Sequence, residues 1–108
     1  MRKIIVSTFL VLTFLSSPAM GEMAADWLDK TNALWDAPGG KFTDPKKAIE
    51  YLNNAIKLKP DYVEAYNNRG VTYLLQGNNN LVCRDAQKAC VLGDCKLLDL
   101  IKCKSLCP

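Results

Sequence analysis

Apolar and polar residues follow each other along most of this chain with the period of an α-helix. Between residues 22 and 104 the apolar positions recur at intervals of three and four, the spacing that places side chains on one face of a helix. Short runs rich in proline, glycine or asparagine separate these segments. No stretch shows the sustained alternation between hairpin turns that a β-sheet needs. The pattern therefore predicts an all-α chain, with helices over residues 22–34, 45–59, 62–77, 81–92 and 95–104.

Capping residues support three of these helix starts. Asp44 can cap the second helix, because Pro45 suits the first helical position. Asp61 precedes the third helix and has Glu64 three residues later, the spacing of a capping box. Asp94 can cap the last helix. The segments between the helices, from Ala37 through Phe42 and from Asn78 to Asn80, are expected to be loop and turn.

Gly70 lies inside the third predicted helix, where a glycine costs about 1 kcal/mol relative to alanine. Close packing against a neighbour such as the second or fourth helix would compensate, and Ala55 and Ala89 on those helices are also small. The alternative is that Gly70 only marks a break in the helix.

The first 21 residues have the layout of a secretory signal peptide. Arg2 and Lys3 precede an uncharged run over residues 4–15. Twelve helical residues span roughly 18 Å, whereas a hydrocarbon core is ~30 Å thick, so a permanent membrane anchor is disfavoured. Cleavage after Ala19 or after Gly21 satisfies the small-residue requirement. The protein is therefore expected to be exported, periplasmic or secreted, with membrane contact only before cleavage.

The charge balance argues against nucleic acid as a partner. The chain has 14 basic and 11 acidic residues and a formal net charge of +3. Loss of Arg2 and Lys3 with the signal peptide would lower this to about +1, too little for an electrostatic nucleic-acid footprint.

The run from Ala48 to Gly77 resembles the tetratricopeptide repeat (TPR), a helical hairpin that usually binds other proteins. The resemblance rests on small, large and aromatic residues in the order of that repeat: Ala48, Leu52, Ala55, Pro60, Tyr66, Gly70 and Tyr73. It implies a right-handed stack of antiparallel αα-hairpins. We expect two TPR-like repeats over residues 22–93, followed by a cysteine-containing capping helix and tail over residues 94–108.

The resemblance also implies a groove for a protein or peptide partner, lined by the first helix of each repeat. Asparagines could hydrogen-bond the partner's backbone, and a tryptophan could anchor an apolar side chain. Alternatively, the tryptophan belongs to the core and the asparagines are only solvated surface. The register of the repeat assigns these residues to the groove: Leu28, Asn32, Trp35, Glu64, Asn67, Val71 and Leu74.

All five cysteines lie in the last 26 residues. Behind a signal peptide, such clustering indicates disulfides. Residues that face each other in an antiparallel hairpin have nearly constant index sums, which favours Cys90–Cys95 and Cys83–Cys103. If the last helix ends early and the tail folds back, Cys107 replaces Cys103. A four-thiolate zinc site or a thioredoxin-type centre is disfavoured, because no pair has CxxC spacing.

The segment over residues 85–98 resembles the linker of cysteine-rich Sel1-like repeats, an exported class in which a cysteine late in one helix is bridged to one early in the next. Some relatives are credited with binding or hydrolysing penicillin-type ligands. The chain has no histidine, and the sequence shows no nucleophile beside a base. We therefore expect a non-enzymatic exported interaction module of a bacterium, an adaptor or assembly factor without a cofactor. The alternatives are the penicillin-type function and a self-associating secreted scaffold.

Overall fold

The computed structural model describes residues 18–107, so the predicted signal run over residues 4–15 lies outside it. Within these residues the chain forms five helices and one short antiparallel strand pair. In chain order the elements are α2 (Pro18–Asn32), β1 (Trp35–Asp36), β2 (Lys41–Phe42), α3 (Pro45–Leu58), α4 (Val63–Leu75), α5 (Asn79–Val91) and α6 (Lys96–Cys103).

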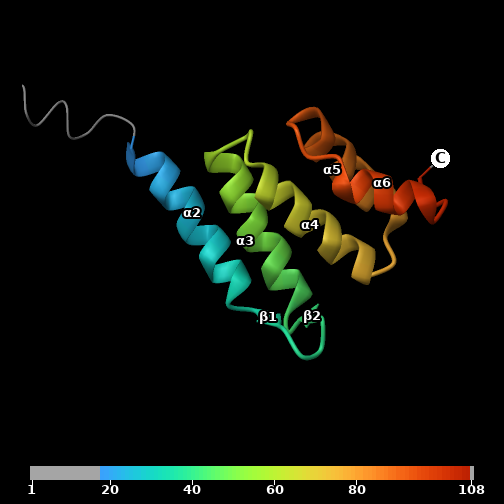
Figure 1. Cartoon of the computed structure of the whole chain (residues 1–108). Coiled ribbons are helices and arrows are strands. Elements are labelled where there is room, and N and C mark those ends of the chain that lie inside the picture. Colours follow the sequence, from blue (N-terminus) through green and yellow to red (C-terminus); the bar gives the residue numbers. More distant parts are fainter. Residues whose placement is uncertain (1–17, 108) are drawn as a thin grey trace, which may run out of the picture.

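Each helix packs against the next helix along the chain. Successive helices run back and forth in Figure 1, from α2 at one end of the stack to α5 and α6 at the other. The last helix, α6, also contacts α4. The predicted all-α stack of antiparallel αα-hairpins is therefore confirmed.

Of the three predicted capping residues, only Asp44 is the N-cap of its helix. The Asp44 carboxylate accepts a hydrogen bond from the Lys47 N–H at 3.1 Å, as predicted. The predicted capping box at Asp61 is wrong, because Tyr62 is the N-cap residue of α4 and its side chain makes no capping bond. In the last helix the N-cap is Cys95, and Asp94 before it accepts from the Lys96 N–H at 3.1 Å. The fourth helix begins earlier than predicted, since the Asn78 side chain accepts from the Leu81 N–H at 3.3 Å. Asn79 and Asn80 therefore belong to the first helical turn of α5, whereas the sequence predicted a connecting turn before the helix.

Three helices end in the same way, with one residue in the left-handed conformation. These residues are Gly77, Gly93 and Ser105, with φ angles of 77°, 115° and 56°. After each of them the next N–H bonds back to a carbonyl five residues earlier, as when Leu106 donates to Ile101 at 3.0 Å. This is the Schellman arrangement. Glycine adopts the conformation readily, whereas at Ser105 the backbone adopts it despite a Cβ.

The sequence predicted that the segment between α2 and α3 is a loop. The structure instead shows a short strand pair there. Trp35 pairs with Phe42 and Asp36 with Lys41 in a two-residue antiparallel ladder. The Gly40 N–H closes the turn by donating to the Asp36 carbonyl at 2.8 Å. Sequence alternation could not reveal this ladder because each strand has only two residues.

Ten buried apolar side chains form two clusters, one toward each end of the stack. The first joins α2, α3 and α4 through Leu28, Leu52, Ala55 and Ala65. The second joins α5 and α6 through Val82, Cys83, Ala86, Leu97, Leu98 and Ile101. Helix α4 lies between them, so its side chains link the two halves of the molecule.

Gly70 lies in α4 where the second cluster begins. A Cβ at this position would lie 2.7 Å from a terminal methyl carbon of Leu97 and 3.4 Å from the Asp85 Cβ. The glycine is therefore part of a continuous helix that packs closely against its neighbours, as the sequence predicted. The close neighbours belong to α5 and α6, however, and neither Ala55 nor Ala89 is among them.

Two disulfides fasten the C-terminal helices. Cys90 is bonded to Cys95, the first pair that the sequence favoured, and Cys83 is bonded to Cys107, with Cα atoms 5.6 Å apart. Cys103 is exposed and free, so the favoured Cys83–Cys103 pairing is wrong and the alternative pairing is present. The reason is local, because α6 ends at Cys103 and the backbone at Ser105 turns the tail back toward α5.

Candidate functional site

A hollow of about 330 Å³ opens between α2, the strand pair and α4. We call it the Trp35 hollow. Asn32 comes from the end of α2, Trp35 and Phe42 from the two strands, and Asn68 and Val71 from α4. Segments far apart in the sequence therefore form one recess, and its surface is more apolar than polar.

The strand pair positions the aromatic wall of the Trp35 hollow. Trp35 and Phe42 are cross-strand partners whose ring centroids lie 4.8 Å apart in an edge-to-face arrangement. Phe42 is buried, whereas Trp35 is 39% exposed. The buried ring thus holds the exposed indole in place, which lowers the entropic cost of ordering it on contact with a ligand.

The polar edge of the hollow consists of two amides. The Asn68 side chain lies 3.5 Å from that of Asn32, at the limit of a hydrogen bond. Both amides keep donors and acceptors that an extended peptide could engage, and the indole and Val71 offer apolar contact. A few polar groups beside an apolar wall are typical of sites that bind a peptide or a small organic molecule.

A second, smaller hollow of about 120 Å³ adjoins the first and shares Phe42 with it. It includes Thr72 and Leu75, which continue along α4 from Val71. Leu75 is 52% exposed although its side chain is large and apolar. The two hollows therefore lie next to each other along α4, on either side of one shared aromatic residue.

The structure brings together three of the seven predicted groove residues: Asn32, Trp35 and Val71. Leu28 is wrong as a groove residue because it is buried in the first apolar cluster. Glu64 is exposed in the first turn of α4, outside the hollow.

The other two predicted groove residues on α4 face the C-terminal helices. Asn67 donates to the Asp94 carboxylate at 2.9 Å, and its own carbonyl oxygen is buried without a partner in the described part of the chain. Leu74 packs against the second apolar cluster.

Sequence reasoning missed two residues of the hollow. Phe42 was missed because its segment was assigned to a loop. Asn68 is three residues before Val71 and one helical turn away, so helical spacing from Val71 could have identified it. On α4 the sequence predicted Asn67 as the groove asparagine, but the residue that lines the hollow is its neighbour Asn68.

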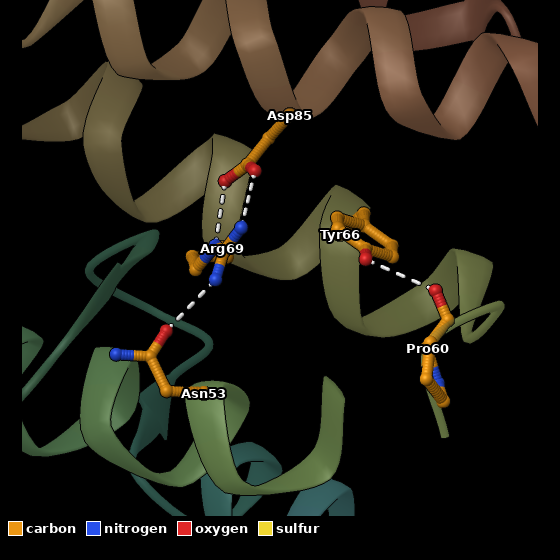
Figure 2. A network of polar contacts seen from close by, with 5 residues as sticks. All are labelled: Asn53, Pro60, Tyr66, Arg69 and Asp85. Carbon is orange, nitrogen blue, oxygen red and sulfur yellow. Dashed lines mark hydrogen bonds and ion pairs between the residues drawn. The ribbon is translucent and has the colours of Figure 1, made fainter. Parts of the chain in front are cut away.

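On the other side of α4 a polar network joins three helices (Figure 2). The Arg69 guanidinium donates to both Asp85 oxygens at 2.8 and 2.7 Å, and to the Asn53 carbonyl oxygen at 2.8 Å. These residues belong to α4, α5 and α3, so one side chain links three elements. The hydrogen bond to Asp85 is the main reason that the pKa of Arg69 is raised, so its charge is held.

Tyr66, also drawn in Figure 2, makes a separate hydrogen bond. Its hydroxyl donates to the Pro60 carbonyl at 3.0 Å, which fastens the turn between α3 and α4. One weak signal for the network lies in the sequence, because Asp85 is the lone acid in the segment of α5. In the structure only 4% of its surface is exposed.

No three histidine, cysteine, aspartate or glutamate side chains within residues 18–107 gather as metal ligands would. No helix in that part of the chain is both long enough and apolar enough to cross a bilayer.

Comparison with known proteins identifies the central hairpin. The family model of the TPR repeat matches residues 45–77, from the first residue of α3 to the glycine that closes α4. The curated proteins and the solved structures gave no match. The chain thus contains a segment like a TPR repeat, a module that commonly binds protein partners and is typically not catalytic. The match ends before the first cysteine, so the Sel1-like resemblance stays a prediction.

Proposed function

We propose that this chain is an exported, non-enzymatic interaction module that binds an extended peptide segment of a partner protein in the Trp35 hollow. The observation that carries the proposal is the exposed indole of Trp35, held by the buried Phe42 beside two amides. An adaptor or assembly factor needs such a surface and no catalytic groups.

The proposal of export rests on the leader-like N-terminal sequence and on the paired cysteines. The apolar run over residues 4–15 follows two basic residues, and paired cysteines suit an oxidising compartment. The intact mass of the protein recovered from the periplasm or medium measures this, and a mature chain that still contains Met1 would contradict it.

Peptide binding is tested with a displayed library of random peptides selected on the mature protein. Selected peptides are then titrated against Trp35→Ala and against the double variant Asn32→Ala/Asn68→Ala. We expect the tryptophan variant to bind at least about 30-fold more weakly, since a central aromatic anchor contributes about 2 kcal/mol or more. The matched control is Asn79→Ala/Asn80→Ala, which removes two exposed amides from the start of α5. Selected peptides that bind all variants equally would show that the site lies elsewhere.

A further inference from the structure

A third hollow, of about 420 Å³, lies on the far side of α4. We call it the basic hollow. The α4 residues that line it point roughly 160° away from those that line the Trp35 hollow, at ~100° per helical residue. Its lining residues come from α3, α4 and α5: Asn53, Tyr66, Arg69, Tyr73, Leu81, Arg84, Asp85 and Lys88. Its surface, unlike that of the Trp35 hollow, is mainly polar.

The charges around this hollow do not balance. Arg69, Arg84 and Lys88 are cationic, and Asp85 is the only acid among the lining residues. The hollow therefore carries a formal charge of two positive units. Arg84 and Lys88 are also four residues apart on α5, where like charges repel each other. A dianion placed among these groups would remove both the excess charge and the repulsion.

Arg69 is prepared for such a ligand. Asp85 and Asn53 engage three of its five N–H groups, which fixes the plane of the guanidinium, and two N–H groups remain for a ligand. The side chain is still 21% exposed. A guanidinium fixed in this way binds phosphate oxygens without first losing its rotamer freedom.

The aromatic rings favour a ligand with a flat organic part. Tyr66 and Tyr73 line the same hollow, and the Arg69 and Lys88 cations lie 5.5 and 6.0 Å from the Tyr66 ring centre. The volume falls within the usual range for small organic ligands, about 300–1,000 Å³. We propose that the basic hollow binds the phosphate monoester group of a small molecule, with the phosphate between Arg69, Arg84 and Lys88. This proposal is independent of peptide binding in the Trp35 hollow.

The proposal is tested by titrating the ¹⁵N-labelled mature protein with phenyl phosphate and following the Arg69 side-chain Nε–H signal. We expect saturable binding that shifts this signal. Arg84→Gln and Lys88→Gln should each weaken binding roughly fivefold, as loss of one nearby charge does. Neither side chain takes part in the hydrogen-bond network in Figure 2, so both variants should fold. The matched control is Lys46→Gln/Lys47→Gln, two exposed lysines on α3 outside the hollow, with less than about twofold effect.

Two other probes decide the ligand class. Benzoate, with one charge, should bind at least about fivefold more weakly than phenyl phosphate. Vesicles with phosphatidic acid carry the same phosphate group on a lipid, and the recessed hollow predicts that they bind no better than vesicles of equal charge without it. The proposal is overturned if phenyl phosphate shows no saturation up to about 10 mM. It is also overturned if the control weakens binding as much as the hollow variants, if benzoate binds equally well, or if only phosphatidic acid vesicles bind.

Discussion

At the scale of single residues, Arg69 has a structural role that no motif in the sequence indicates. It lies between the two apolar clusters and joins α3, α4 and α5 by hydrogen bonds. Asp85, its partner, is almost fully buried. A buried carboxylate is tolerated only when it is paired, so the arginine also makes the position of the acid possible.

Replacement of Arg69 should therefore be costly. We expect Arg69→Ala to lower the free energy of unfolding by about 3 kcal/mol, because it leaves Asp85 buried without its partner. Arg69→Lys should recover less than half of this loss, since an ammonium group cannot donate to both carboxylate oxygens and to Asn53 in the same geometry. Urea denaturation measures both. The control is Arg84→Gln, an exposed cation on α5, with an effect within about 0.5 kcal/mol. Full stability of Arg69→Lys would show that the bidentate geometry contributes nothing.

At the scale of helices and strands, the sequence predicted what local chemistry determines. The helical period placed all five helices, and the Asp44 cap and the Gly77 and Gly93 ends followed from known preferences. It failed where contacts between distant segments decide. The pairing of Trp35 with Phe42 and that of Arg69 with Asp85 depend on tertiary packing, so Phe42 in the Trp35 hollow and all of the network were missed.

The end of α6 shows a different kind of failure. Glycine is typical of a helix end, so Gly77 and Gly93 indicate where their helices stop. The third left-handed position is occupied by Ser105, and a serine does not indicate a helix end. The sequence therefore predicted no turn after the last helix, and the index sums of an antiparallel hairpin favoured Cys103 as the partner of Cys83. The observed partner, Cys107, depends on the turn at Ser105.

This turn provides a prediction at the same scale. Ser105→Gly should raise the free energy of unfolding by about 0.5–1 kcal/mol, because glycine adopts φ near 56° without a Cβ conflict, although it gains entropy in the unfolded chain. Ser105→Ala keeps the Cβ and should have no such benefit. Thermal unfolding of the oxidised proteins compares the two. If glycine stabilised no more than alanine, the backbone at this position would not be left-handed in solution.

At the scale of the whole molecule, the stack is short. The family model matches one repeat, over residues 45–77, whereas three repeats usually form a stable array. The second apolar cluster depends on the small helix α6. Leu97, Leu98 and Ile101 supply half of its buried members. The disulfides hold this helix against α5, so they compensate for the small size of the stack.

The two disulfides should contribute unequally to this compensation. Cys83–Cys107 spans 24 residues and Cys90–Cys95 spans five, so the first restricts the unfolded chain more. We expect Cys83→Ala/Cys107→Ala to lower the free energy of unfolding by about 3 kcal/mol and Cys90→Ala/Cys95→Ala by about 2 kcal/mol, measured by urea denaturation. Cys103→Ala is the control and should change little, because this thiol is exposed and unbonded in the described chain. Alkylation and peptide mapping of the oxidised protein should label Cys103 alone. Labelling of Cys107 instead would contradict the structure. It would mean that α6 continues past Ser105 and that a Cys83–Cys103 disulfide holds it against α5.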